Sequence, residues 1–217
     1  MTGSASRKPR PMGGELQKGS EIMMKIFRPL SLLLVLIFIA GCAAKIPHAL
    51  VPDFGKKGVR LIAVMPVKNV SSDVKSGAML RAKLFDELYF KGYPRIPLRL
   101  IDERLAGVSS GSEVAVSPQA VGEILKVDAA LYTTLHESQR GSGVLYASTV
   151  AEAEFELRST KTGEILWRVR HREVYRNYGF SSHNIELKSS MVYEQAIGDC
   201  VNKALDTLPD SPDTSGN

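Results

Sequence analysis

The sequence has few of the residues that build disulfide frameworks and metal sites, and it has no apolar run long enough for a stable membrane span. Only two cysteines are present, Cys42 and Cys200, which excludes a framework of several disulfides. The four histidines, at positions 48, 136, 171 and 183, show no ligand spacing, so we expect no metal site. The apolar stretch Leu30–Ala40 has eleven residues, fewer than the roughly 17–25 that a transmembrane helix needs.

A basic excess is also missing from most of the chain. The net charge of +5 arises in the first 41 residues, which hold six of the 28 basic residues and two of the 23 acidic ones. From Cys42 onward the net charge is therefore only +1. The basic segment Arg168–Arg176 has glutamates to match its arginines. A nearly neutral chain of this kind does not predict a nucleic-acid partner.

What the sequence does contain is an export signal. Lys25 and Arg28 precede the apolar stretch, which ends in Ile39-Ala40-Gly41-Cys42 and resembles the lipobox of bacterial lipoprotein precursors. The resemblance implies cleavage before Cys42, diacylglycerol on its thiol and an acyl chain on its new amino group, which together make a stable membrane anchor. Cys200 is then left without a disulfide partner. An uncleaved signal anchor, or a cysteine placed there by chance, is the alternative.

The layout of the chain follows from this motif. A signal peptide that starts at Met24 is compact, so we expect residues 1–23 to be an upstream extension that is not made and residues 24–41 to be the signal peptide. Residues 42–58 are expected to form a tether of at most about 50 Å. Residues 59–208 are expected to form one α/β domain, and 209–217 a disordered tail. Ala43 and Ala44, in the sorting rule of lipoproteins, favour the outer membrane over the inner one.

Hydrophobic periodicity predicts the elements of the domain. Strands are expected at 59–67, 98–101, 129–135 and 149–157, with a further strand from Ile165 onward. Helices are expected at 77–90, from Ser117-Pro118 to Lys126, and at 184–208. The predicted order is β-α-β-α-β-β-β-α, in a mixed sheet with an antiparallel hairpin and helices packed against it. Cys200 borders the apolar stripe of the last helix, which predicts a buried thiol rather than a nucleophile.

The hairpin is the most sharply defined part of the prediction. A three-residue loop, Lys161-Thr162-Gly163, places Glu156 opposite Arg168, Glu154 opposite Arg170 and Glu152 opposite Arg172. The same register opposes Leu157 to Trp167 and Phe155 to Val169. Both faces of the hairpin agree with this register, which a shift by one residue would not allow.

Three segments carry a resemblance to a known fold family. They are Ile62–Asp73 (IAVMPVKNVSSD), Lys126–Leu135 (KVDAALYTTL) and Thr162–Trp167 (TGEILW). Together with the order of elements, they resemble the envelope lipoproteins that share the fold of CsgG, LpoB and the TolB amino-terminal domain. The chain is most similar to a family of bacterial lipoproteins without an assigned function that includes a meningococcal surface lipoprotein. CsgG forms its pore with membrane-spanning strands, but the hairpin here carries Glu and Arg on its outer face, so we expect no pore from this chain alone.

Two segments stand out as candidate partner surfaces. The first is the loop with Asn69, Ser71, Ser72 and Asp73, whose position before a helix suits either phosphate binding or, more simply, helix capping. The second is the aromatic segment with Tyr175, Tyr178 and Phe180, which either contacts a partner or covers the end of the sheet. Gly141-Ser142-Gly143 precedes a strand, so it is interpreted as a turn and not as a catalytic serine motif. No catalytic residue and no metal ligand is predicted.

Two functions are consistent with these observations. The first is a non-catalytic adaptor that is anchored in the outer membrane, faces the periplasm and serves an envelope secretion or assembly complex, with CsgG-like lipoproteins among its expected partners. The alternative is a lipid-anchored protein that binds a small molecule or a lipid between the sheet and the helices. In both, no cofactor is expected apart from the covalent diacylglycerol and the N-acyl chain on Cys42, and the oligomeric state is open.

Overall fold

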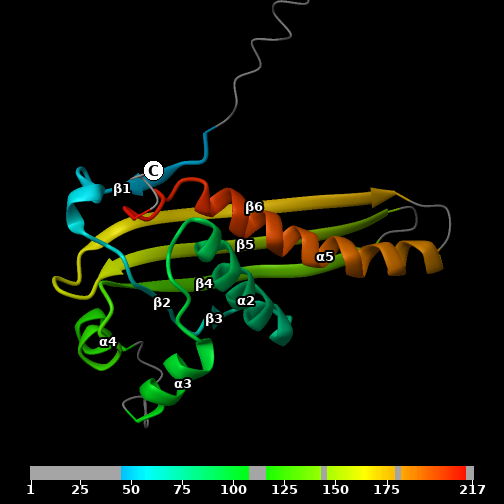
Figure 1. The fold of residues 1–217 in the computed structure, drawn as a ribbon. Coiled ribbons are helices and arrows are strands. Elements are labelled where there is room, and N and C mark those ends of the chain that lie inside the picture. Colours follow the sequence, from blue (N-terminus) through cyan, green and yellow to red (C-terminus); the bar gives the residue numbers. More distant parts are fainter. Residues whose placement is uncertain (1–44, 108–115, 143–145, 179–181, 214–217) are drawn as a thin grey trace, which may run out of the picture. The chain divides into compact units, whose positions relative to one another are not determined.

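A mixed six-stranded sheet forms the centre of the fold (Figure 1). The computed structural model describes residues 45–107, 116–142, 146–178 and 182–213. The order across the sheet is β1 (His48–Leu50), β6 (Ile165–Tyr178), β5 (Tyr146–Ser159), β4 (Ala129–Ser142) and β2 (Ile62–Val64), and the short β3 (Lys68–Asn69) also pairs with β4. β2 and β3 run parallel to β4, whereas the other neighbours are antiparallel. The predicted mixed α/β class is confirmed.

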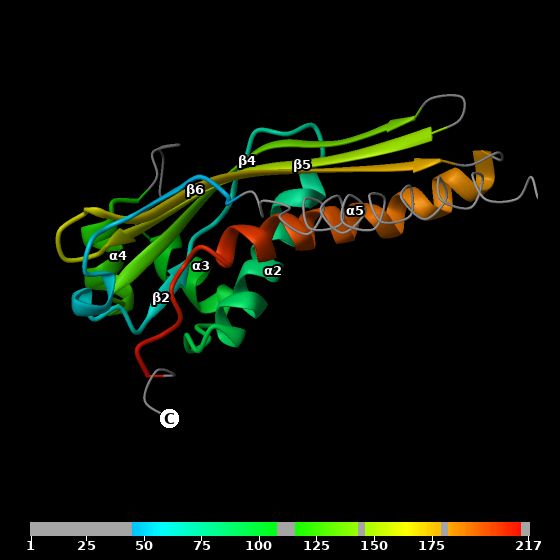
Figure 2. The ribbon, with the colours of Figure 1, turned by 90° about the horizontal axis from the view of Figure 1, so that it is seen from above.

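Helices lie on both faces of the sheet, but they cover the two faces unequally. α2 (Val74–Phe90) and α5 (Ser182–Leu205) bury one face, and Figure 2 shows α5 running along the length of β4, β5 and β6. α3 (Leu98–Ala106) and α4 (Pro118–Leu125) cover a smaller part of the other face, beside β2, β4 and the end of β5. Because side chains alternate along a strand, Leu131 enters the first core and Ala130 the second.

The predicted hairpin register is confirmed. Glu156 lies opposite Arg168, Glu154 opposite Arg170 and Glu152 opposite Arg172, while Leu157–Trp167 and Phe155–Val169 face the core. The three long strands β4, β5 and β6 each contain 14 residues, so the meander extends well beyond the predicted bounds of its first strand at 129–135. Gly141 and Ser142, interpreted as a turn, belong to β4 and pair with Ser148 and Ala147 of β5.

One predicted strand is wrong. Residues 98–101 begin the helix α3, which follows Pro97. Ile101 and Leu105 are buried in the second core, and Leu98 packs against both cores. Their spacing of three or four residues places them on one side of a helix. The four residues 98–101 were too short a segment to separate strand from helix. The strand predicted at 59–67 is also shorter, since β2 covers only Ile62–Val64.

The domain begins earlier and ends later than predicted. His48–Leu50 of the expected tether form β1 on the edge of β6, and Phe54 of the short 3-10 helix η1 (Phe54–Lys57) is buried. At the other end, Pro209 accepts a hydrogen bond from the Tyr93 hydroxyl at 2.9 Å, and the buried Ser211 donates its N–H to Lys91 at 2.8 Å. Residues 209–213 of the expected disordered tail are therefore held against the domain, whereas 214–217 lie outside the described residues.

Candidate functional site

The loop between β3 and α2 is folded by its own polar side chains. The Asn69 side-chain oxygen accepts bonds from the backbone N–H of Ser71 at 3.0 Å and from its hydroxyl at 2.7 Å. The Asn69 amide donates to the carbonyl oxygen of Asp73 at 2.7 Å. Asp73 is the N-cap of α2, because its Oδ1 accepts the N–H of Lys75 at 2.9 Å. The capping interpretation of this segment is therefore the one that the structure shows.

Asp73 also connects α2 to α5 and β4. The hydroxyl of Tyr193 on α5 donates to Asp73 Oδ2 at 2.7 Å and lies 2.5 Å from the hydroxyl of the buried Ser138 on β4. Tyr193 is only 2% exposed, and burial is the main reason that the pKa of its phenol is raised. This bridge of three side chains holds the loop rigidly on the domain. The carboxylate of Asp73 also makes the start of α2 unsuitable for the phosphate that the sequence allowed.

Two apolar side chains are exposed at this loop, beside polar ones. Val70 is 61% exposed and Val74 is 87% exposed, and the exposed Ser72 lies between them. Val70 lies on the loop and Val74 is the first residue of α2, and both expose apolar surface to solvent. Such a pair is suited to contact with another protein.

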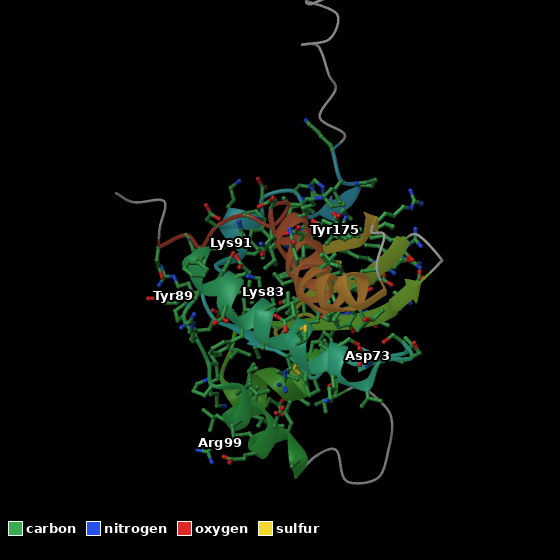
Figure 3. All side chains as sticks on the ribbon, turned by 90° about the vertical axis from the view of Figure 1, so that its right-hand side faces the viewer. Asp73, Lys83, Tyr89, Lys91, Arg99 and Tyr175 are labelled. Carbon is green, nitrogen blue, oxygen red and sulfur yellow. The ribbon has the colours of Figure 1, made fainter. Side chains whose placement is uncertain are left out.

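The second predicted surface is described only in part. Tyr175 packs against the first core and donates its hydroxyl to Asp199 on α5, and this hydrogen bond, followed by burial, raises its pKa to about 12. The structure therefore shows that Tyr175 covers the sheet. Tyr178 pairs through its backbone with Tyr146, but its side chain and the whole of Phe180 lie outside the described residues. Figure 3 shows Asp73 and Tyr175 on either side of α5, so the two predicted surfaces do not form one patch.

A groove that sequence reasoning missed lies on the sheet face opposite α5. It has a volume of about 410 Å³ and lies between the start of α4 and strands β3, β4 and β5. The lining side chains include Lys68, Ser117, Pro118, Tyr132, Glu156 and Arg158. These segments are far apart in the sequence, and no local pattern indicates that they meet. Lys68 is separated from Val70 by one residue, so the groove adjoins the exposed valines along the chain.

Charged and aromatic groups are fixed in position within this groove. The Tyr132 hydroxyl donates to the Val116 carbonyl oxygen at 2.6 Å, and burial raises the pKa of this tyrosine to about 12. The Arg158 guanidinium lies 5.9 Å from the centre of the Tyr132 ring and bonds to Glu156 at 2.5 and 3.0 Å. Glu156 also pairs with Arg168 at 3.2 Å. The groove thus offers an aromatic ring and both signs of charge.

Beyond the groove, the exposed face of β5 and β6 carries a ladder of ion pairs. Glu152 pairs with Arg170 at 2.6 Å and with Arg172 at 3.4 Å. Glu154 pairs with Arg168, and with His136 at 3.4 Å. The arginines therefore contact glutamates diagonally as well as directly across the strands. These contacts account for the basic segment without a nucleic-acid ligand.

Other reactive groups of the described residues serve the packing. Cys200 is fully buried, which confirms its predicted place in the core. Burial raises the pKa of its thiol to about 12, so the thiol is protonated at neutral pH. His171 lies 2.6 Å from Glu173, which Lys203 also contacts at 2.7 Å. Within the ranges that the structure describes, no group of three or more His, Cys, Asp or Glu is placed to hold a metal ion. No described helix is both long enough and apolar enough to cross a membrane.

The predicted lipidation motif lies outside the described residues. Cys42 and the preceding Ile39, Ala40 and Gly41 fall in the range 1–44, so their assignment stays a prediction from the sequence. The first described residue, Lys45, is three positions after Cys42.

Comparisons with known proteins find several similar solved structures. Among solved structures, the chain is similar to lipoprotein GNA1162 from Neisseria meningitidis, with 25% identity over 62% of this chain and 95% of that one and a TM-score of 0.48. It is also similar to the PelC dodecamer from Paraburkholderia phytofirmans (13% identity, 78% and 98% covered, TM-score 0.49) and to the LpoB C-terminal domain from Salmonella enterica (12% identity, 64% and 92% covered, TM-score 0.40). A comparison with curated protein sequences finds no match.

The family is shown by the sequence itself. Residues 53–215 match the family model described as "Putative lipoprotein GNA1162-like", a range that covers well over half of the chain. This confirms the lipoprotein family predicted from the sequence, whereas the likeness to CsgG and to TolB stays a prediction. The protein therefore belongs to the GNA1162-like lipoprotein family.

Proposed function

We propose that the protein is an outer-membrane lipoprotein that faces the periplasm and acts as a non-catalytic adaptor in an envelope secretion or assembly complex. The observation that carries this proposal is the Ile39-Ala40-Gly41-Cys42 motif, directly after an apolar stretch, in a chain that belongs to a lipoprotein family. Acyl chains on Cys42 anchor the domain, and Ala43 and Ala44 favour sorting to the outer membrane.

The groove and the adjoining valines form the adaptor surface in this proposal. We name this the groove surface and define it by Lys68, Tyr132 and Arg158 of the groove together with Val70 and Val74. The exposed valines supply apolar contact, and the groove supplies an aromatic ring and fixed charges. The partner is therefore an envelope protein with an extended segment that carries apolar and charged side chains.

The anchor is tested by changing Cys42→Ser in the full chain. The variant is expected to leave the membrane fraction or to accumulate unprocessed, because it has no thiol for the diacylglycerol. Cys200→Ala is the matched control and should stay in the membrane fraction, since its buried thiol contacts only the core. Unchanged membrane fractionation of Cys42→Ser would contradict the anchor.

The adaptor surface is tested by photo-crosslinking in cells. A photoreactive residue is placed at Lys68 or Val74, and at the exposed Lys161 in the hairpin turn as a control. Recurrent crosslinks to the same envelope protein from Lys68 and Val74, but not from Lys161, are expected. Equal crosslinking from all three positions would refute the groove surface.

The volume of the groove favours one alternative, which is a lipid-anchored protein that binds a small molecule or a lipid. A groove of about 410 Å³ lies within the range of roughly 300–1,000 Å³ that ligand sites occupy. Native mass spectrometry of the purified protein separates the two functions. A ligand that copurifies with a monomer, and that Arg158→Ala removes, would favour the alternative over the adaptor.

A further inference from the structure

The folded domain starts only a few residues after the anchor. Ile46 packs against the first core, and its carbonyl oxygen lies 2.9 Å from His48 Nδ1. His48, Ala49 and Leu50 then pair with β6, and Val51 donates its N–H to the Leu166 carbonyl oxygen at 3.0 Å. Because residues 46–51 are held on the domain by these contacts, they cannot act as a tether.

The segment between Cys42 and Ile46, which we call the leash, is therefore very short. Four steps along the chain separate Cys42 from Ile46, and an extended chain covers at most about 3.6 Å per residue, which gives about 14 Å. The sequence alone allowed about 50 Å. A domain on such a leash cannot move away from the bilayer or turn freely above it, so one particular side of it must stay beside the headgroups.

The strand order identifies that side. β1 is one outer strand of the sheet and β2 is the other, so four strand spacings of about 4.8 Å, or about 19 Å, separate them. α3 packs beside β2, and α4 packs beside β4. Figure 1 shows β1 along one side of the sheet and α3 on the opposite side, and Figure 3 shows Arg99 of α3 at the end of the domain away from β1.

The surface at β1 has the chemistry of a membrane contact. All three residues of β1 are exposed, and Leu50 is 38% exposed. Lys45 precedes this strand, and the exposed Lys56 and Lys57 follow it in η1, balanced in part by Asp53 and Glu164. Basic residues beside the acyl anchor are attracted to anionic phospholipid headgroups.

We propose that the β1 edge, defined by His48, Leu50 and Lys56, rests on the phospholipid surface, so that β2 and α3 lie on the side of the domain farthest from the membrane. This proposal rests on the acylation of Cys42 in the proposed function. It adds an orientation: the groove, which lies on a face of the sheet at β4 and β5, opens to the periplasm above the bilayer and not toward the headgroups.

A quenching experiment tests the orientation with the lipidated full chain. In a Cys200→Ala background, a fluorophore is attached to His48→Cys or to the control Arg99→Cys, both at exposed positions. The protein is bound to vesicles of phosphatidylethanolamine and phosphatidylglycerol that carry a nitroxide quencher on a fraction of the headgroups. Quenching is expected to be several-fold stronger at position 48 than at position 99.

A longer leash tests whether the short segment after Cys42 causes the orientation. Insertion of about 15 Gly and Ser residues between Ala44 and Lys45 should keep the protein on the vesicles while quenching at position 48 falls toward that at position 99. Equal quenching at both positions in the bound chain without the insertion, or no change with the longer leash, would overturn the orientation. A chain that does not bind vesicles at all would refute the anchor itself, so the two failures are distinguishable.

Discussion

Tyr193 carries a buried hydroxyl that unites three elements of the fold. It donates to Asp73 at the start of α2, and it lies 2.5 Å from Ser138 of β4. A cap among Asn69, Ser71 and Asp73 could be predicted from the sequence, because short polar residues preceded a helical pattern, although the choice of Asp73 comes from the structure. The contact with Tyr193 could not, since 120 positions separate the two residues and only the packing of α5 brings them together.

Removal of this hydroxyl should destabilise the domain. We predict that Tyr193→Phe lowers the free energy of unfolding by about 1–2 kcal/mol, because it takes a hydrogen-bond partner from the buried Ser138 and from Asp73. Urea unfolding of the mature chain with Cys42→Ser measures this loss. Tyr175→Phe is the control and should cost less, since Tyr175 is only half-buried and water can replace its bond to Asp199. A larger loss from Tyr175→Phe than from Tyr193→Phe would contradict this role of the bridge.

At the scale of elements, the strength of the local pattern decides what the sequence could predict. The β5–β6 hairpin was predicted with its register because two independent faces, one charged and one apolar, agreed over the same residues. The α3 segment offered only the run Leu98–Ile101, so strand and helix could not be separated. β1 is three residues long, and all three are exposed. It has no alternation of buried and exposed residues from which it could be predicted, since it is held by its pairing with β6.

The ion-pair ladder on this hairpin makes stability depend on pH. Burial opposes the ionisation of Glu154, but hydrogen bonds from Arg168 and His136 outweigh it and lower its pKa. The unfolded chain therefore binds this proton more readily, so the stabilisation is present at neutral pH and is lost as pH falls below about 5 toward the lowered pKa.

Replacing this carboxylate should weaken the acid dependence. We predict that Glu154→Gln flattens the curve of unfolding free energy against pH between about 3 and 5, measured by urea unfolding at each pH. Glu103→Gln on α3 should leave the curve almost unchanged, because solvent screens its exposed pair with Arg99. Parallel curves for the wild-type chain and Glu154→Gln would show that the ladder does not contribute.

The packing of α4 against the end of β5 depends on a glycine. A Cβ atom at Gly122 would lie 2.6 Å from the Cβ of Thr160, which is buried and fixed by its hydroxyl bonds to Val127 and Asp128. We predict that Gly122→Ala costs about 1–3 kcal/mol despite the higher helix propensity of alanine.

Gly107→Ala provides the comparison for this clash. Gly107 ends α3 with a helical backbone. Among the residues that the structure describes, no atom beyond its own surroundings lies within 4 Å of an added methyl group, so its substitution should be neutral or slightly stabilising in thermal unfolding. If both variants proved equally stable, the close approach of α4 to Thr160 would not exist in solution.

At the scale of the whole molecule, the sequence predicted the anchor and the class of fold but neither the groove nor the orientation. Lys68, Ser117, Tyr132 and Arg158 come from four separate segments, and only the sheet order and the position of α4 bring them into one groove. The leash was overestimated for a related reason. A segment with two prolines and two glycines looks like a linker, although β6 and the first core hold it from Ile46 onward.

The central claim is that the thiol of Cys42 carries the lipid that holds this domain to the membrane. Mass spectrometry of the amino-terminal peptide from the native membrane protein tests it most directly. We predict a mature chain that begins at Cys42 and carries the mass of a diacylglycerol group and an amide-linked acyl chain. A mature peptide with an unmodified Cys42, or one that still contains residues before it, would contradict the account.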